Sequence, residues 1–332
     1  MSVINESHKN LLALHCITLK NETKNHVVIQ LKDSTNDTKI SNNLYNKLLS
    51  AIENHISHKD VPDYELPEIS FGVELEFVGS SNQYDISKFQ AKMSRLLGEN
   101  FFASFTYTHN DGKSWILGVD NSIERYDPLL RDPNGYELSS PKLKLNNPKD
   151  IETLKTVIYY CKEFLHASVN SSCGTHIHIG FKHDKTFRGN ICEVLSAYGT
   201  MEKLIFDPIV PTSRRRNKYC KQTRPFVRNK YQKLSSRYCD FTYDGECKDI
   251  RFEFRQLEGT LDLQTIMYWA ELQTNILYDL LDHSADYAYT SWLMNRNIFE
   301  ILLYYFDKNS SLVNFFISRV IDFKSRTLTS CN

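Results

Sequence analysis

The chain has 332 residues, of which 41% are hydrophobic and 12% are aromatic, so it is long enough for one large domain or two ordinary ones. Its 40 basic and 40 acidic residues balance, so bulk charge gives no argument for a nucleic-acid or membrane partner. No signal-peptide pattern occurs at the start, and no apolar run is long enough to span a membrane. The 8 cysteines are scattered without a CxxC pair, which predicts reduced thiols and a cytoplasmic protein.

The first part of the chain, residues 1–69, is predicted to be an N-terminal extension. It is rich in Asn, Lys and Ser, and we predict a strand over residues 26–32 and a helix over residues 41–57. In that helix leucine and isoleucine recur on one face, which is typical of a helix packed on a core. The sequence indicates no role for this extension.

Three later segments share an unusual strand pattern: FGVELEF at residues 71–77, GTHIHIG at residues 174–180 and RFEFR at residues 251–255. Each alternates apolar and polar residues with period two, which predicts a β-strand with one apolar face. The other face carries Glu74 and Glu76, His176 and His178, or Glu253 and Arg255. Paired in one sheet, these faces would form a floor of carboxylates, imidazoles and a guanidinium, which suits a divalent cation and a polyphosphate.

Each of these pairs also has a structural interpretation without a ligand. Glu74 and Glu76 could be surface glutamates on an edge strand, although two carboxylates on one face repel unless a cation lies between them. The two histidines could be satisfied structural residues, and Glu253 and Arg255 could form a cross-strand ion pair. We favour metal ligation for the glutamates because the flanking phenylalanines indicate a central strand. For the histidines both interpretations stay open.

The rest of the chain alternates predicted helices and strands at uneven spacing. Helices are predicted over residues 85–97, from an Asn147 cap to about residue 165, over 189–206 and 262–281, with two more between 295 and 323; further strands are predicted over 115–119 and 135–140. This order predicts an α+β fold with a mainly antiparallel sheet. It excludes a doubly wound nucleotide fold, which needs regular βαβ alternation and a Gly-rich first turn.

One polar loop, residues 211–231, carries the densest basic charge of the sequence, including Arg214, Arg215, Arg216 and Lys218. Such runs are mostly solvated surface or nucleic-acid patches. Here the loop lies between two segments that carry potential metal ligands, and a metal–polyphosphate would be drawn to the same place. We therefore favour phosphate binding over nucleic-acid binding and predict no nucleic-acid partner.

Taken in chain order, these segments resemble the amidoligase branch of the carboxylate–amine ligase superfamily, which includes glutamine synthetase and glutamate–cysteine ligase. The matching pieces are FGVELEF (71–77), Trp115 with VDNSI (119–123), YELSSP (136–141), CGTHIHIG (173–180), PTSRRRNKYC (211–220) and RFEFRQLEGTLD (251–262). The resemblance implies a catalytic domain over residues 70–285 and a C-terminal helical segment, residues 286–332, that packs on it. The implied fold is α+β, with a curved, mainly antiparallel sheet of about six strands flanked by helices, as in the catalytic fold of glutamine synthetase.

The resemblance also implies a reaction. It implies ATP and two or more Mg²⁺ or Mn²⁺ ions on the concave face of the sheet. A carboxylate, such as a glutamyl side chain, would attack the γ-phosphate of ATP. An amine would then displace phosphate from the acyl phosphate, which gives an amide or isopeptide bond and ADP. Each substrate could be a small molecule, a peptide or a protein side chain.

Roles for individual residues follow from the same resemblance. The ligands of a metal that touches the ATP phosphates would be Glu74, His176 and Glu253. Those of a metal nearer the carboxylate substrate would be Glu76 and Glu137. The nucleotide phosphates would be approached by His178, Arg216, Arg255 and Lys218. The transferring phosphoryl group would be stabilised by Arg255, Arg214 and Arg215, and Asp120 would orient a ligand or the amine.

Three alternatives stay open. Guanidino kinases resemble this sheet, and a phosphotransferase of that kind would leave its acceptor stably phosphorylated. A metal-dependent hydrolase built on the His-x-His pair would act without ATP. A non-catalytic nucleotide-binding module would bind the nucleotide without turnover. The sequence indicates neither the identity of the substrates nor the oligomeric state.

Overall fold

The computed structural model describes residues 17–22, 26–31, 38–57, 69–103, 112–181, 191–215, 220, 241–244, 250–283, 291, 294–306 and 310–329. The chain divides into two compact units. The first comprises Met1–Glu65, Cys192–Pro211 and Asp279–Asn332, and the second comprises Leu66–Ile191 and Thr212–Tyr278. Segments from both ends and the middle of the chain therefore belong to the first unit. The division predicted from the sequence, with boundaries after residues 69 and 285, stays a prediction.

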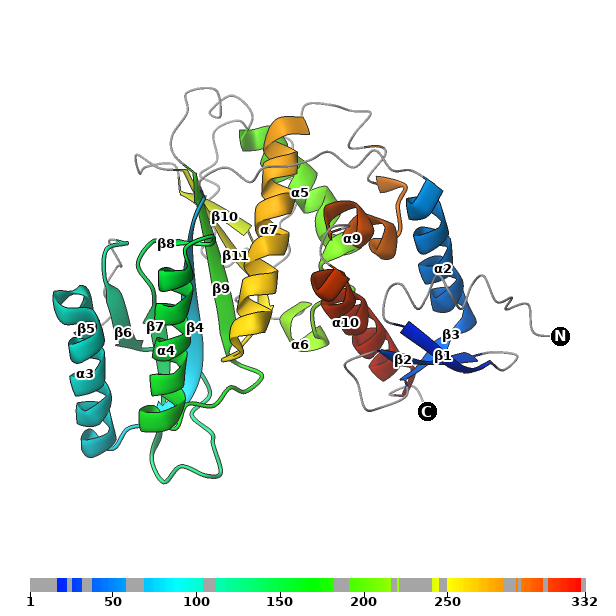
Figure 1. Cartoon of the computed structure of the whole chain (residues 1–332). Coiled ribbons are helices and arrows are strands. Elements are labelled where there is room, and N and C mark those ends of the chain that lie inside the picture. Colours follow the sequence, from blue (N-terminus) through cyan, green and yellow to red (C-terminus); the bar gives the residue numbers. More distant parts are fainter. Residues whose placement is uncertain are drawn as a thin grey trace. The chain divides into compact units, whose positions relative to one another are not determined.

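The second unit is built on one sheet of eight strands. They are β4 (Ser70–Ser80), β5 (Phe101–Ala103), β6 (Trp115–Val119), β7 (Pro133–Ser139), β8 (Leu143–Lys144), β9 (Gly174–Phe181), β10 (Phe241–Asp244) and β11 (Ile250–Glu258). Seven of them follow in the order β10-β11-β9-β4-β7-β6-β5, and β8 pairs with β4. The three segments with alternating polar residues thus lie on the neighbouring strands β11, β9 and β4 (Figure 1).

The sheet that the structure describes has eight strands, more than the six or so that the resemblance implies, and it is mixed but mainly antiparallel, as predicted. All its pairings are antiparallel except that of β5 with β6, which is parallel. β5 and β8 have 3 and 2 residues. Strands this short show no alternation in the sequence, so the sequence pattern does not predict them. Helices flank the sheet, as predicted.

The two faces of the large sheet differ in polarity. One is apolar, and its register places Val73 opposite Ile177 and Leu75 opposite Leu138, all of them buried. Phe254 continues this layer on β11. The other face carries the polar residues of the alternating segments, because successive side chains on a strand point to opposite faces. The hydrophobic core on one side therefore determines which residues line the other.

Helices of the second unit pack beside this sheet. They are α3 (Gln83–Leu97), α4 (Pro148–Leu165), α6 (Thr212–Arg215) and most of α7 (Leu263–His283), with a 3₁₀ turn at Gly98–Asn100. α4 begins as the sequence predicts: the Asn147 side chain accepts a hydrogen bond from the Lys149 N–H, and Pro148 occupies the first turn. α3 and α4 lie side by side, and α4 contacts β4 (Figure 1). Leu154 and Leu165 of α4 are fully buried.

The first unit combines a three-stranded antiparallel sheet with helices. The strands are β1 (Ile17–Glu22), β2 (His26–Leu31) and β3 (Thr38–Ser41), and the helices are α2 (Asn42–Ser57), α5 (Ile191–Ile205), α9 (Ile298–Phe306) and α10 (Ser310–Thr329). α9 contacts α2 and α10, and α10 contacts β3. The predicted strand and helix of this part are present as β2 and α2, whereas β1 and β3 are additional.

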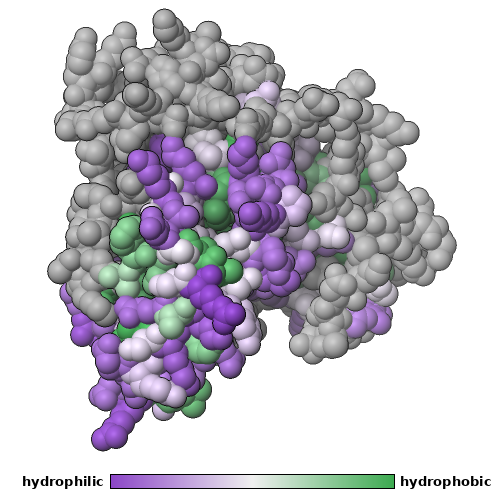
Figure 2. Space-filling view, turned by 60° about the vertical axis from the view of Figure 1, so that its left-hand side comes forward, coloured by the Kyte–Doolittle hydropathy of each residue, from purple (hydrophilic) through white to green (hydrophobic). Residues whose placement is uncertain are grey.

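On the face shown in Figure 2, hydrophilic residues surround smaller hydrophobic patches. Among the described residues, the most exposed large apolar side chains are Leu129, which is 91% exposed, and Tyr126 in the same loop. None of the described helices is long and apolar enough to cross a membrane.

Candidate active site

The polar face of the large sheet brings distant parts of the chain together. Residues that lie opposite one another on neighbouring strands share a face of the sheet. The register pairs Glu253 with His178, Glu74 with His176, and Glu76 with Glu137. The alternating segments therefore do pair in one sheet with their polar faces aligned, and β7 adds a further carboxylate to them.

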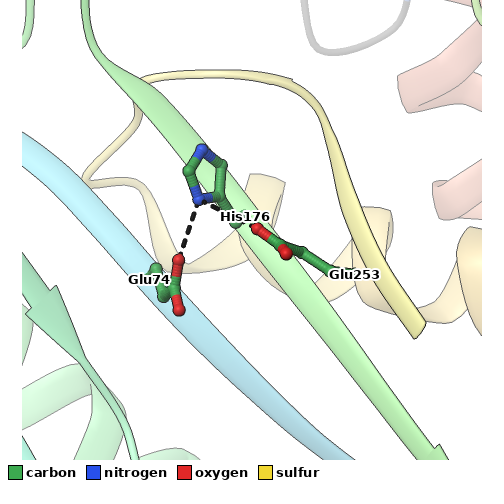
Figure 3. Close-up of side chains that lie close together, drawn as sticks. All are labelled: Glu74, His176 and Glu253. Carbon is green, nitrogen blue, oxygen red and sulfur yellow. Dashed lines mark hydrogen bonds and ion pairs between the residues drawn. The ribbon is translucent and has the colours of Figure 1, made fainter. Parts of the chain in front are cut away.

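Glu74, His176 and Glu253 form a first group, here called the histidine cluster (Figure 3). Nδ1 of His176 lies 2.9 Å from Oε2 of Glu74 and 3.6 Å from Oε1 of Glu253. One potential ligand atom from each residue lies within 4.8 Å of the other two. His176 is only 2% exposed, so the sheet holds its ring in place. This arrangement allows all three residues to bind one cation.

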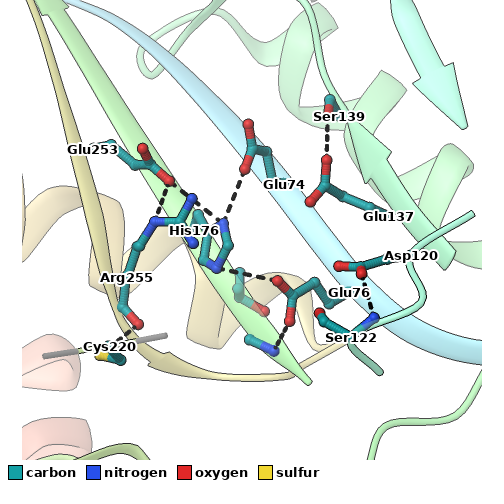
Figure 4. A network of polar contacts seen from close by, with 12 residues as sticks. Glu74, Glu76, Asp120, Ser122, Glu137, Ser139, His176, Cys220, Glu253 and Arg255 are labelled. Atoms are coloured by element: carbon teal, nitrogen blue, oxygen red, sulfur yellow. Dashed lines mark hydrogen bonds and ion pairs between the residues drawn. The ribbon is translucent and has the colours of Figure 1, made fainter. Parts of the chain in front are cut away.

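Glu76, Asp120 and Glu137 form a second group, here called the carboxylate cluster (Figure 4). Glu76 and Glu137 face each other across β4 and β7. Asp120 directly follows β6, on which Gly118 lies opposite Glu137. Because Asp120 is two residues beyond Gly118, it reaches the same face. One carboxylate oxygen from each residue lies within 4.8 Å of the others.

The backbone around Asp120 fixes its place in the carboxylate cluster. The Asp120 N–H donates to the carbonyl oxygen of Gly135 at 3.0 Å, and Oδ1 of Asp120 accepts from the Ser122 N–H at 2.7 Å. A Cβ atom on Gly135 would lie 2.5 Å from the Asp120 carbonyl oxygen, so this close approach requires glycine. The sequence predicts only an orienting role for Asp120. Its position two residues beyond Gly118, which lies opposite Glu137, is the signal that points to a third ligand.

One imidazole links the two clusters. Nε2 of His176 lies 3.3 Å from Oε1 of Glu76, while Nδ1 faces the other members of the histidine cluster. Oε2 of Glu76 accepts a 2.6 Å hydrogen bond from the backbone N–H of Gly174. Glu76 is thus held by β9 at both of its oxygen atoms. Two cations bound here would be neighbours.

His178 pairs with Glu74 and belongs to neither cluster. Its Nε2 atom lies 3.1 Å from Oε1 of Glu74. Burial raises the pKa of Glu74, but the charge of His178 and hydrogen bonding to the two histidines outweigh burial and hold this pKa well below its usual range. Burial lowers the pKa of His178, yet the charge of Glu74 raises it overall. Both shifts favour an ion pair between the two side chains.

The pKa of Glu137 is shifted in the direction opposite to that of Glu74. Burial raises its pKa well above the usual range, and the negative charges of Glu74, Glu76 and Asp120 add to this effect, while Arg255 opposes it. Carboxylates that repel one another in this way are stabilised by a cation placed between them. The electrostatics of the carboxylate cluster therefore fit a cation site.

Arg255 lies on the same face as both clusters. Its Nε atom is 2.6 Å from Oε1 of Glu253, an ion pair that lacks the angle of a hydrogen bond. The pairing of β11 with β9 shifts by one residue after Phe254. Two residues of β11, Arg255 and Gln256, therefore lie opposite the single residue His176 of β9. Such a β-bulge changes the direction in which a side chain points. The side chain of Arg255 points toward Glu253, which lies two residues earlier on the same strand (Figure 4).

The basic loop is described only in part. Arg214 in α6 is 2% exposed and donates from Nη2 to the carbonyl oxygen of Arg255 at 2.5 Å. Arg215 ends the same helix and is half-buried. Arg216 and Lys218 lie outside the described residues. The phosphate contacts expected of these basic residues stay predictions.

The donor atoms of both clusters favour hard divalent cations. The carboxylate cluster offers oxygen atoms alone, and the histidine cluster adds one imidazole to two carboxylates. Mg²⁺ and Mn²⁺ prefer oxygen ligands, and Mn²⁺ also accepts imidazole. The arrangement can therefore hold two such cations close to the Arg255 guanidinium, and together these positive charges would suit a polyphosphate.

Comparison with known proteins gives three findings. The sequence model of a family described as "Putative amidoligase enzyme" matches residues 67–277, which include both clusters. No curated protein matches the sequence significantly. Among solved structures 19 chains match, including a cryo-EM structure of Plasmodium falciparum glutamine synthetase with 11% sequence identity and a TM-score of 0.35. That alignment covers 80% of this chain but 62% of the other, so the chain spans less than two thirds of that protein's length.

Proposed function

The chain belongs to the amidoligase family, and from this premise we propose that it is an ATP- and Mg²⁺-dependent carboxylate–amine ligase. It would form an amide or isopeptide bond and release ADP and phosphate. The observation that carries the proposal is the pair of clusters on one face of the sheet, which share strand β4 and are linked by His176. A cytoplasmic location and a glutamine synthetase-like catalytic fold belong to the same proposal.

Both clusters fit divalent cations in this reaction. The histidine cluster would hold the ion nearer the nucleotide phosphates, and the carboxylate cluster would hold the ion nearer the carboxylate substrate. The repulsion that raises the pKa of Glu137 is the observation that supports the second ion. When bound, such ions would neutralise the negative charge of the phosphates.

The chemistry would follow two displacements. An oxygen of the substrate carboxylate attacks the γ-phosphorus of ATP, the bond to ADP breaks, and an acyl phosphate forms. The amine nitrogen then attacks the acyl carbon, phosphate leaves with the bonding electrons, and the amine proton is released. Arg255 would bind an oxygen of the transferring phosphoryl group, and Asp120 would orient the amine or a ligand.

This chemistry needs no covalent nucleophile from the protein, and the described cysteines are poor candidates for one. Cys161, Cys173 and Cys220 are buried free thiols. Burial raises the pKa of Cys173 to about 11, and it raises that of Cys161 further. Thiols of this kind stay protonated near neutral pH, whereas the thiolate is the reactive form. Charge neutralisation and positioning are therefore the means of catalysis that the site supports.

The three alternative functions fit the two clusters to different degrees. A hydrolase whose metal is held by both histidines is disfavoured, because His178 is in neither cluster. A phosphotransferase would use the same clusters and differs only in its product. A non-catalytic module would bind nucleotide and never turn it over. The product formed from ATP therefore separates these alternatives.

A substrate screen with mass detection tests the proposal. Purified protein, ATP and Mg²⁺ are incubated with pools of carboxylates and amines, and ADP release is followed together with the mass of new products. We expect ADP release that depends on both pools, and a product whose mass is the sum of the two substrates less one water. Turnover of any pool without ATP, or a stable phosphorylated acceptor, would contradict the ligase assignment.

A further inference from the structure

The carbonyl group of Arg255 marks the place where β11 leaves its regular pairing with β9. The bulge sets Arg255 and Gln256 together opposite His176, and a bulge leaves one residue without its usual ladder partner. The Arg255 carbonyl oxygen instead accepts from Nη2 of Arg214 at 2.5 Å and from Sγ of Cys220 at 3.1 Å. Side chains from the basic loop therefore support the bulge.

The same guanidinium also lies against strand β9. A Cβ atom on Gly174 would lie 2.7 Å from Nη2 and 3.0 Å from Nη1 of Arg214, so the guanidinium rests directly on the glycine backbone. The N–H of Gly174 donates to Glu76. Arg214 thus contacts β11 at Arg255 and β9 beside a member of the carboxylate cluster.

The burial of Arg214 argues against direct contact with a nucleotide. Its side chain is 2% exposed, and it forms no ion pair with another residue in the part of the chain that the structure describes. Burying a charge without a counter-charge costs folding free energy, and an apolar side chain of similar volume would cost less. What an apolar side chain lacks is the planar group that donates to the Arg255 carbonyl while lying flat on Gly174.

We infer that Arg214 is a positioning residue. It supports the β11 bulge through the Arg255 carbonyl, which directs the Arg255 side chain toward Glu253, and it does not itself bind the phosphates. This inference replaces the phosphoryl contact that the sequence predicts for Arg214. The effect of Arg214 on catalysis rests on the proposed function, whereas its support of the Arg255 backbone does not.

Arginine side-chain NMR tests the support of Arg255 without any substrate. In protein labelled with ¹⁵N-arginine, the Nε–H cross-peak of Arg255 is identified by its loss in Arg255→Lys. The Arg255 Nε atom is buried beside Oε1 of Glu253, so we expect its proton to exchange slowly with water. We expect Arg214→Met to shift the cross-peak and to speed its exchange with water. Gly174→Ala should also shift the Arg255 cross-peak and speed its exchange. This change alters neither arginine, but the added Cβ would displace the guanidinium of Arg214.

A matched control comes from the other compact unit. Arg319 also donates from Nε to a backbone carbonyl, that of Ile209, at 2.9 Å. Arg319→Met should leave the Arg255 cross-peak unchanged. An unchanged Arg255 cross-peak in both Arg214→Met and Gly174→Ala would overturn the inference, provided that thermal unfolding shows both variants to be folded.

Nucleotide binding tests the consequence for function. The probe is Mn²⁺ with adenylyl methylenediphosphonate, titrated by calorimetry. We expect Arg214→Met and Arg255→Met each to weaken binding by about tenfold, and the double variant to bind as Arg255→Met does, because both changes remove one function. A further tenfold loss in the double variant would show that Arg214 binds phosphate independently and would overturn the inference. Absence of binding by the unaltered protein would instead contradict the proposed function, and the NMR result would still decide the role of Arg214.

Discussion

Nε2 of His176 lies 3.3 Å from Oε1 of Glu76, while Nδ1 of the same ring lies 2.9 Å from Glu74. One imidazole therefore stands between the two carboxylates of strand β4 and connects the histidine cluster with the carboxylate cluster. The consequence is that the proposed metal sites are adjacent but use different glutamates. Changes in one cluster can therefore be tested separately from changes in the other.

Two Mn²⁺ ions are expected to bind per chain, one at each cluster. Glu253→Gln should remove the ion of the histidine cluster, and Glu137→Gln should remove that of the carboxylate cluster, because each change deletes one anionic ligand. Electron paramagnetic resonance or calorimetric titration measures the stoichiometry. A ligand at 100 times its dissociation constant stabilises a protein by about 2.7 kcal/mol, so chelation should lower the unfolding temperature measurably. Equal stoichiometry in all three proteins would refute the two-site arrangement.

Glu74→Gln is expected to abolish ATP-dependent product formation, with a loss of about 100-fold or more. Glutamine keeps the shape of the side chain but removes the charge that faces His176 and His178. The unfolding temperature should change by only a few degrees. Glu152→Gln, which removes an exposed carboxylate paired with Lys155, is the matched control and should leave activity unchanged. If Glu74→Gln unfolds the protein, the glutamate has a structural role instead.

Gly135→Ala is expected to displace Asp120. The added Cβ would lie 2.5 Å from the Asp120 carbonyl oxygen and 2.8 Å from Cβ of Ile123, which forces the loop away. Overpacking of this kind costs about 1–3 kcal/mol of folding free energy. Urea unfolding measures this cost, and Mn²⁺ titration should show weaker binding at the carboxylate cluster alone. Gly72→Ala is the control for stability, because its Cβ would meet no atom closer than 3.6 Å.

Asp127 is expected to make a small, pH-dependent contribution to stability. The Ser168 hydroxyl and then the Leu129 N–H donate to its carboxylate and lower its pKa below the usual value, against a weak opposing effect of burial. The folded state then binds the proton less tightly than the unfolded state. The stabilisation is therefore present above the unfolded-state pKa and is lost as the pH falls through the folded-state pKa.

Urea unfolding of Asp127→Asn checks this contribution. The variant should be less stable than the unaltered protein near neutral pH, and the difference should vanish in acid. Ser168→Ala removes the donor of the main contact and should have a similar effect. A difference that grows as the pH falls would have the wrong sign for the lowered pKa.

The sequence by itself determined the chemistry of the polar face. Period-two alternation is a local property, so it shows which residues of one strand share a face without reference to the rest of the chain. This is why the alternation alone predicts that Glu74 and Glu76 share one strand face, and that His176 and His178 share another. The family assignment rests on the same segments, which the family match over residues 67–277 includes.

Only the tertiary structure decided which of these residues meet. Glu74 and His176 are 102 residues apart in sequence, and a shift of one residue in strand register would turn either side chain to the other face. The bulge at Arg255, the burial of Arg214 and the place of Asp120 beside Glu137 depend on such long-range pairings. The parallel pairing of the short strand β5 and the grouping of three chain segments in the first unit do so as well. Local patterns record which side chains a strand presents, whereas contacts between strands are set by the packing of the whole core.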